Sequence, residues 1–183
     1  MNIPNIISIF RLFLIPVFVW FFLREHVDGR MWAGIIFLVA CISDIIDGYI
    51  ARKYNMISRI GEALDPLADK LLQMTVVICL FVSHTIGILI VFLFLIKEVL
   101  MIVGGTLLMS KISKVIPSKW YGKAATVIFS LVVFIAIVFH HIPRGIVNTM
   151  FLGAFAMSFY AFINYYFIFK KYNSVKKEES DKT

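Results

Sequence analysis

The sequence is poor in the residues that build disulfide-bonded or histidine-based metal domains. It has only two cysteines, four histidines and five prolines among 183 positions. Cys41 and Cys79 both fall inside apolar runs, so we expect small buried packing residues and neither a disulfide nor a soft-metal site. No spacing typical of a metal site joins the histidines, so a histidine metal centre is not expected.

A cleavable signal peptide is not expected at the start of the chain. No basic cluster precedes Arg11. The first apolar run is followed by Arg24, Glu25 and His26, where a signal peptide would carry a small-residue cleavage site. We therefore count the first apolar run as part of the folded protein.

Apolar residues dominate what is present, at 61% of the chain with 18 phenylalanines. A soluble domain holds roughly half its residues as apolar, so the composition predicts an all-α integral membrane protein. A spanning helix needs roughly 20 apolar residues. We predict six spans, at about 5–24, 31–53, 61–83, 86–109, 120–140 and 146–169.

The basic residues are distributed by membrane side, and the net charge is +7. The richer side collects Arg52, Lys53, Arg59, Lys111, Lys114, Lys119, Lys123, Lys170, Lys171, Lys176, Lys177 and Lys182. The other side has only Arg24, Arg30 and Arg144. The richer side should be cytosolic, which places both termini inside and makes nucleic acid an unnecessary explanation of the charge. We predict one membrane domain over 1–170 and a frayed, charged cytosolic tail over 171–183.

Four aspartates lie between the second and third apolar runs, near the predicted cytosolic face. They are Asp44, Asp47, Asp65 and Asp69. An ionised carboxylate near hydrocarbon is costly unless something compensates it, and four together would repel one another. A divalent cation removes both problems, so the cluster predicts a metal site.

The spacing of these aspartates supports one shared site. Asp44 and Asp47 are three residues apart, and Asp65 and Asp69 are four apart, so each pair shares a helix face. Two antiparallel helices joined by a short loop can bring both pairs together. The resulting oxygen cage suits Mg²⁺, Mn²⁺ or Ca²⁺, and four carboxylates are enough for two ions acting on a phosphorus centre.

The residues around the aspartates leave room for a phosphate-bearing ligand. Gly48, Ala51 and Gly61 keep the helix surfaces low, so a ligand can approach the backbone. Arg52 supplies a positive fork for phosphate. The alternative, in which the aspartates merely end two helices at the interface, explains one pair but not two pairs with interleaved glycines and an arginine.

The pattern Asp-x2-Asp-Gly-x2-Ala-Arg-x8-Gly-x3-Asp-x3-Asp resembles the signature of the CDP-alcohol phosphatidyltransferases. It begins at Asp44 and ends at Asp69, and the chain matches every defined position. The six-span layout and the length are similar too, so the resemblance covers nearly the whole chain. It implies a homodimeric, multi-pass enzyme of the cell membrane that takes CDP-diacylglycerol and faces the cytoplasm.

The resemblance also implies roles for individual residues. The four aspartates would hold Mg²⁺ or Mn²⁺, with two ions in the site. Gly48, Ala51, Arg52 and Gly61 would line the pocket for the cytidine diphosphate group. Asp69 would also act as general base on the acceptor hydroxyl, which attacks the β-phosphorus and releases CMP. The residues alone do not say which aspartate is the base.

The identity of the acceptor alcohol depends on residues outside the aspartate motif. The opening from Asn2 to Arg11 resembles that of bacterial phosphatidylglycerophosphate synthases and related cardiolipin synthases, which favours glycerol 3-phosphate. Arg11, Lys97 and Lys123 could bind the acceptor phosphate. That set is less cationic than is usual in this branch, so phosphatidylglycerol, giving cardiolipin, stays an alternative.

Lys97 and Glu98 form a charged pair inside the fourth apolar run. Adjacent residues on a helix do not face each other, so we expect each to take another partner and to line a functional cavity. Two further classes compete with the enzyme. A cation transporter would place acidic residues near the bilayer midplane and show inverted repeats, which this sequence lacks. A membrane scaffold would leave the aspartate spacing unexplained.

Overall fold

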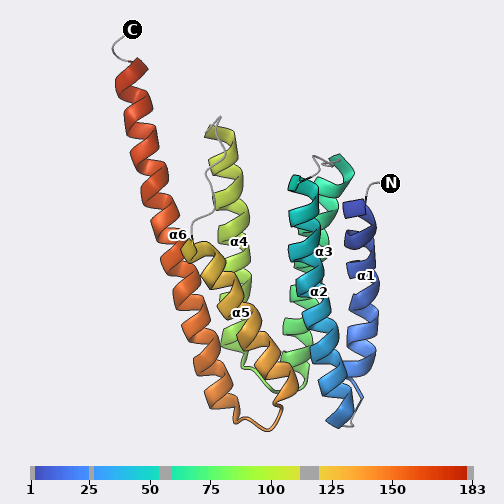
Figure 1. Ribbon diagram of the computed structural model, residues 1–183. Helices are drawn as coiled ribbons and strands as arrows, with labels where there is room; N and C mark the ends of the chain where they lie inside the picture. Colours follow the sequence, from blue (N-terminus) through green and yellow to red (C-terminus); the bar gives the residue numbers. More distant parts are fainter. Residues whose placement is uncertain (1–2, 25–26, 54–58, 112–119, 181–183) are drawn as a thin grey trace. The chain divides into compact units, whose positions relative to one another are not determined.

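The computed structural model describes the backbone of residues 3–24, 27–53, 59–111 and 120–180. Within these ranges it describes the side chains of residues 7–24, 28–48, 67–104, 120–164 and 167. The described backbone forms six α-helices and no strand (Figure 1). The helices are α1 (Ile3–Phe22), α2 (Val27–Lys53), α3 (Arg59–Val82), α4 (Ile88–Lys111), α5 (Trp120–Val138) and α6 (Arg144–Ser180).

The prediction of an all-α chain is confirmed, and each helix coincides with one predicted apolar run to within a few residues at its start. Three helices contain a described stretch long and apolar enough to cross a bilayer, at Asp28–Gly48, Trp120–Val138 and Arg144–Asn164. A shorter apolar stretch covers Ile7–Phe22. The chain is therefore built from membrane-type helices.

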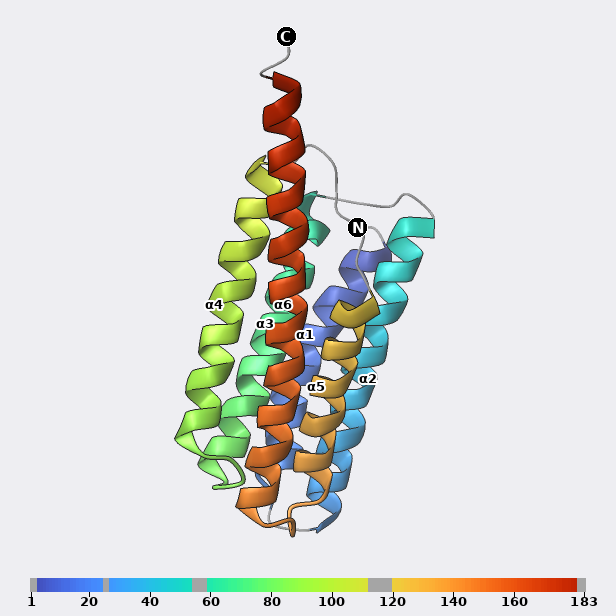
Figure 2. The ribbon, with the colours of Figure 1, turned by 90° about the vertical axis from the view of Figure 1, so that its left-hand side faces the viewer.

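The expectation of a frayed tail after residue 170 is wrong for the described part, because α6 continues to Ser180. No proline or glycine interrupts the sequence after Gly153, and the end is rich in lysine and glutamate, which favour helix. In both views α6 extends beyond the end of α4 (Figures 1 and 2). The backbone of the charged segment up to Ser180 therefore continues the helix that contains the sixth predicted span.

The chain divides into two compact units, and α5 and α6 contribute to both. The first unit comprises residues 1–87 and 133–147. In it α1 packs against both α2 and α3. The α1–α2 pair is antiparallel, because Phe21 near the end of α1 lies 6.1 Å from Trp32 near the start of α2, measured between ring centroids. The core of this unit includes Phe18, Phe37 and Leu72.

One glycine in the first unit allows a close helix contact. A Cβ atom added to Gly34 on α2 would lie 2.4 Å from Cγ2 of Val138, which is at the end of α5. Phe134, one turn earlier on α5, lies against the same position. A side chain at Gly34 would therefore push these two helix segments apart.

The turn after α3 is a Schellman motif, with backbone hydrogen bonds from His84 to Phe81 and from Thr85 to Leu80. His84 takes the left-handed position of this motif, with φ at 56°. Glycine is the usual residue there because a Cβ atom makes this conformation less favourable. The turn therefore carries a small local strain.

The second unit comprises residues 88–132 and 148–183. Its centre is aromatic, with Phe94 stacked on Phe129 at 6.0 Å between centroids and Phe155 at 5.9 Å from Phe129. A Cβ atom added to Gly104 on α4 would lie 2.8 Å from the Phe162 ring of α6. Small and aromatic residues thus interdigitate between α4 and α6.

Large apolar side chains point outward from the helices. Phe13 and Ile45 are each 69% exposed, and Val82 is 62% exposed. Contiguous exposed apolar surface of this kind is avoided by soluble monomers and is expected where lipid surrounds the protein. The outward faces and the apolar helices together identify a membrane protein.

Candidate active site

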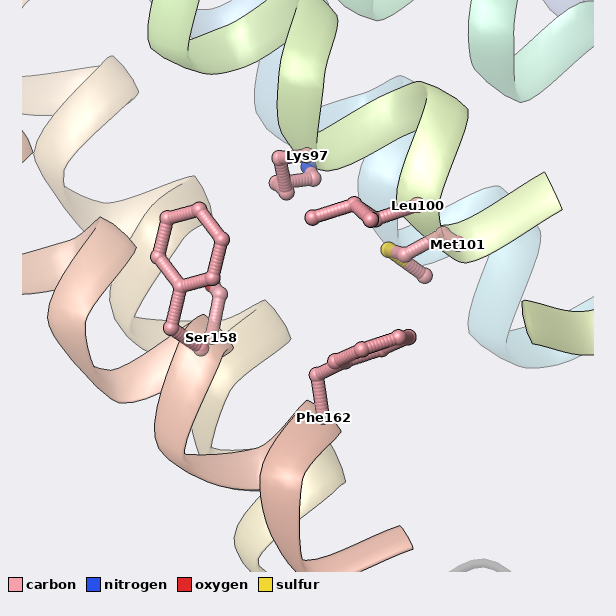
Figure 3. A pocket seen from close by; sticks show the side chains of 6 residues that line it. Lys97, Leu100, Met101, Ser158 and Phe162 are labelled. Atoms are coloured by element: carbon pink, nitrogen blue, oxygen red, sulfur yellow. The ribbon is translucent and has the colours of Figure 1, made fainter. Parts of the chain in front are cut away.

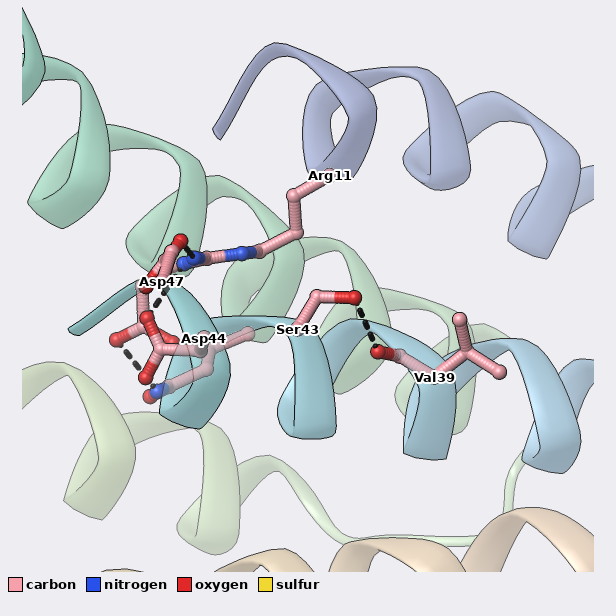
Figure 4. Close-up of polar contacts among 7 residues, drawn as sticks. Arg11, Val39, Ser43, Asp44 and Asp47 are labelled. Carbon is pink, nitrogen blue, oxygen red and sulfur yellow. Dashed lines mark hydrogen bonds and ion pairs between the residues drawn. The ribbon is translucent and has the colours of Figure 1, made fainter. Parts of the chain in front are cut away.

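A buried arginine joins α1 to the end of α2. Arg11 is fully buried, and its Nη1 atom lies 2.7 Å from Oδ1 of Asp44. Its Nη2 atom donates a short hydrogen bond to Oδ2 of Asp47 (Figure 4). One guanidinium group therefore balances both carboxylates that the sequence places on one face of α2.

The two carboxylates differ sharply in their surroundings. The Asp47 side chain is 3% exposed, whereas the Asp44 side chain is 48% exposed. An unpaired carboxylate at Asp47 would be strongly unfavourable, because no water could solvate it. Arg11 therefore supplies a charge partner for the enclosed Asp47, while Asp44 remains accessible from outside the helix cluster.

A third aspartate approaches the same place from α3. Asp69 is partly buried, and its Oδ2 atom accepts a hydrogen bond from Nε2 of Gln73 at 3.0 Å. It also lies within electrostatic range of Asp44, Arg11 and Lys70. Carboxylates of α2 pair with the buried arginine, and a carboxylate of α3 lies within electrostatic range of them.

The remaining residues of the predicted site lie in or next to the segment whose side chains the structure does not describe. Gly48 follows Asp47 near the end of α2 and is half-buried. Ala51 and Arg52 lie on the last turn of α2, and Gly61 and Asp65 lie on the first turns of α3. The side chains of these four residues lie outside the described ones. Their roles as metal ligand or pocket residues stay predictions.

The carboxylate oxygens of the described aspartates are the ligand type that a hard divalent cation binds. These oxygens do not form a complete coordination set among the described side chains. Asp44, Asp47 and Asp69 offer only carboxylate oxygens, the ligand type that Mg²⁺ and Mn²⁺ take. Asp44 and Asp47 already converge on a positive charge, that of Arg11. Among the described side chains, which leave out Asp65, no three acidic, histidine or cysteine groups form a metal-binding cluster. The fit therefore rests on donor type and on the demand for a cation.

Sequence reasoning assigned Arg11 to phosphate binding and missed its pairing with the aspartates. A signal for the pairing was present, because an arginine within an apolar run needs a counter-charge. Gln73 was missed as well. It lies four residues after Asp69, the spacing at which helix side chains meet.

One part of the expectation for Lys97 and Glu98 is wrong, because the two adjacent residues do meet and form an ion pair. Nζ of Lys97 lies 2.8 Å from Oε1 of Glu98. The four-carbon lysine stem is long enough to curl back along the helix, so neighbouring positions can meet at their tips. Nζ of Lys97 also lies 4.3 Å from the ring centroid of Phe129. The lysine is held within the second unit by a carboxylate and an aromatic face.

Lys97 borders a small hollow between α4 and α6 in the second unit (Figure 3). The other lining residues are Leu100, Met101, Ser158, Phe159 and Phe162. The Ser158 hydroxyl donates to the backbone carbonyl of Ala154, so the hollow has an almost entirely apolar lining.

Lys123 also belongs to the second unit, where it is exposed on the first turn of α5. The aspartates belong to the first unit. The prediction that Lys123 faces the aspartates therefore stays a prediction, as does its role in binding the acceptor phosphate.

Comparison with known proteins supplies an independent line of argument. A protein of Aquifex aeolicus named CDP-diacylglycerol–glycerol-3-phosphate 3-phosphatidyltransferase is 35% identical over 133 residues, which are 72% of each chain. A protein of Rickettsia bellii with the same name is 46% identical over 79 residues, which cover 43% of this chain and 44% of that protein. A Mycobacterium bovis protein, whose name assigns it provisionally as a cardiolipin synthase, is 37% identical over 126 residues, covering 69% of this chain and 59% of that protein.

The family model for CDP-alcohol phosphatidyltransferases matches residues 1–163. This match includes α1 to α5, the first part of α6 and the whole aspartate segment. The earlier resemblance, which rested on the motif between Asp44 and Asp69, is thereby confirmed over most of the chain. The chain belongs to the CDP-alcohol phosphatidyltransferase family.

Proposed function

We propose that the chain transfers the phosphatidyl group of CDP-diacylglycerol to glycerol 3-phosphate, forming phosphatidylglycerol phosphate and CMP. Membership of the family supports the enzyme class. The acceptor is supported by the Aquifex and Rickettsia relatives, whose names specify glycerol 3-phosphate. The aspartate cluster of the first unit is where we locate the chemistry.

The observation that carries this proposal is the pairing of Asp44 and Asp47 with Arg11, with Asp69 of α3 within electrostatic range. Carboxylates from α2 and α3 lie within electrostatic range of one another, within a motif shared with a family of phosphatidyl transferases. A purely structural ion pair would need one carboxylate for one arginine. The surplus of negative charge is what a cationic cofactor would balance.

Asp69 is the proposed general base. Gln73 donates to its Oδ2 atom and so orients the carboxylate on α3. The other oxygen would accept the proton of the acceptor hydroxyl while that hydroxyl oxygen bonds to the β-phosphorus. The bond from this phosphorus to the CMP oxygen breaks, and CMP leaves with the electron pair.

The other aspartates would act on the pyrophosphate through a metal. Asp44, Asp47, Asp65 and Asp69 would hold Mg²⁺ or Mn²⁺, with two ions, and the bound metal would neutralise charge on the phosphoryl oxygens. Gly48, Ala51, Arg52 and Gly61 would border the cytidine diphosphate group. Arg52 would donate a forked pair of N–H groups to a phosphate.

We further propose six membrane spans, with both termini and the aspartates on the cytosolic side of the cell membrane, and a homodimer. The lengths of the helices and the concentration of lysine and arginine at one set of helix ends support this orientation. Asp44 and Asp47 lie in the C-terminal half of α2, which supports a site nearer one membrane face than the midplane. A substrate with tails in the bilayer and a polar head outside it would reach such a site.

A second candidate function is cardiolipin synthesis, with phosphatidylglycerol as acceptor. It is supported by the Mycobacterium bovis relative, at 37% identity over 69% of this chain. Lys97 also favours it, because this cation is already occupied by Glu98 and aromatic rings in the second unit. A pocket with fewer available cations suits the singly charged phosphodiester of phosphatidylglycerol better than the more highly charged phosphomonoester of glycerol 3-phosphate.

A mixed-acceptor assay separates these candidates. The purified chain, in detergent with Mg²⁺ or Mn²⁺ and CDP-diacylglycerol, receives equal amounts of glycerol 3-phosphate and phosphatidylglycerol. CMP release measures total turnover, and mass spectrometry of the lipids identifies the product. We expect phosphatidylglycerol phosphate, whereas predominant cardiolipin would assign the second function and no CMP release with either would reject both.

A further inference from the structure

The Arg11 guanidinium is the most deeply buried positive charge among the described side chains. It contacts two carboxylates of one helix, Asp44 and Asp47. Its Nε atom is buried and makes no hydrogen bond to any described residue. The Nη1 contact with Asp44 is an ion pair at 2.7 Å without hydrogen-bond alignment.

This geometry indicates that charge holds the arginine more than directional hydrogen bonding does. A guanidinium has five N–H donors, and a structural arginine at full burial normally uses most of them. Here the Arg11 guanidinium makes one hydrogen bond of good geometry, from Nη2 to Oδ2 of Asp47. A contact set mainly by charge can be exchanged for a contact with another cation.

We propose that Arg11 is the resting counter-ion of the Asp44–Asp47 pair and that it competes with the divalent cation for these carboxylates. This inference rests on the metal site of the proposed function. Asp44 is the carboxylate that changes partner, because it is 48% exposed and can reach an incoming ion. Asp47 exchanges its contact with the arginine less readily, because both side chains are almost fully enclosed.

If Arg11 competes with the metal, removing Arg11 should make metal binding tighter. Without Arg11, the metal-free chain loses the cation that pairs with both carboxylates, whereas the metal-bound chain still has the metal beside them. The metal-free state therefore loses more stability, and metal binding becomes tighter. An arginine that instead orients Asp47 as a ligand would have the opposite effect, because loss of such support weakens metal binding.

The test measures binding of Mn²⁺ alone to the full chain in detergent micelles, by electron paramagnetic resonance. We expect the Arg11→Met variant to bind Mn²⁺ roughly tenfold more tightly than the wild-type chain, a conservative figure for removing a buried pairing partner. Arg11→Lys should fall between them, because an ammonium makes a single-point contact and cannot span both carboxylates. Thermal unfolding should show a lower midpoint for metal-free Arg11→Met and a larger rise on Mn²⁺ addition than in the wild-type chain.

Arg30→Met is the matched control. Arg30 is a half-buried arginine of the same unit whose guanidinium lies 3.9 Å from the Phe22 ring centroid, and its Nη1 atom is also buried without a described hydrogen-bond partner. It lies on α2 fourteen positions before Asp44, which is roughly 21 Å along a helix. This variant should lower thermal stability and leave the Kd for Mn²⁺ unchanged.

The outcomes separate this inference from the proposed function. Wild-type binding of Mn²⁺ with an equal or weaker affinity in Arg11→Met contradicts the competition alone and leaves the metal site in place. Absence of Mn²⁺ binding by both chains contradicts the metal site and the competition together. Should Arg11→Met fail to fold, Arg11→Lys decides, because a Kd equal to or above that of the wild-type chain overturns the proposal.

Discussion

Replacing Asp47 with asparagine should destabilise the chain far more than the same change at Asp44. The two residues lie on one face of α2 and share Arg11. Asparagine keeps the size of each side chain and removes only the charge. The comparison therefore isolates how much each carboxylate contributes to the pairing of a buried guanidinium.

The structure sets the two magnitudes. Arg11 and Asp47 are both almost fully buried, so Asp47→Asn leaves a charge whose nearest remaining partner is half-exposed. Removing one partner of a buried pair costs about 3–5 kcal/mol of unfolding free energy. Asp44 is 48% exposed and solvent screens its contact, so Asp44→Asn should cost about 1 kcal/mol or less.

Reversible unfolding in mixed detergent micelles, without added metal, would measure both changes in unfolding free energy. Asp28→Asn is a suitable control, because Asp28 is an exposed carboxylate in the first turn of the same helix. Its loss should cost about 0.3–1 kcal/mol through the helix dipole. Equal destabilisation at Asp44 and Asp47, or a loss at Asp47 no larger than that at Asp28, would refute the assignment of Asp47 as the principal partner of Arg11.

Four further predictions concern activity and local stability. Asp69→Asn should lower turnover by about 10²–10⁴-fold while CDP-diacylglycerol binding stays measurable, and a variant that keeps more than about a tenth of the wild-type rate would exclude Asp69 as the base. Exhaustive chelation should abolish CMP release, and Mg²⁺ or Mn²⁺ should restore it; full turnover in verified metal-free buffer would count against the metal site. Lys123→Ala should raise KM for glycerol 3-phosphate more than KM for CDP-diacylglycerol, and no change in either would remove Lys123 from the acceptor site. His84→Gly should raise the unfolding free energy by up to about 1 kcal/mol, because glycine adopts the left-handed turn at φ 56° without strain; a lower unfolding midpoint would contradict this.

The aspartate site shows what motif reasoning reaches and where it ends. Spacing of three and four residues predicted that carboxylates on two helices share a site, and Asp44 and Asp69 do lie within electrostatic range. The same reasoning assigned Arg11 to a substrate phosphate, because sequence distance hides a contact between residues 36 positions apart. Which basic group neutralises an acidic one depends on how α1 packs against α2.

Lys97 and Glu98 show a different limit. The rule that adjacent helix residues do not face each other describes Cβ directions, and it holds best for short side chains. A lysine stem surrounded by Phe94 and Phe129 is guided by packing toward its neighbour, so the pair forms despite the helix geometry. Phe94 lies one turn before Lys97 on the same helix, but the ring of Phe129 comes from α5, and no local pattern specifies that contact.

The sequence by itself determined the helical class, the approximate position of each helix, the membrane character and the family. These follow from local and additive properties, namely runs of apolar residues long enough for a bilayer and a motif of fixed spacing. The tertiary structure alone decided that Arg11 pairs with Asp44 and Asp47, that Asp47 is enclosed while Asp44 stays half-exposed, and that Lys97 pairs with Glu98. Burial and ion pairing arise from which helix faces meet, and in a chain that is apolar on nearly every helix face the hydrophobic pattern cannot specify those faces.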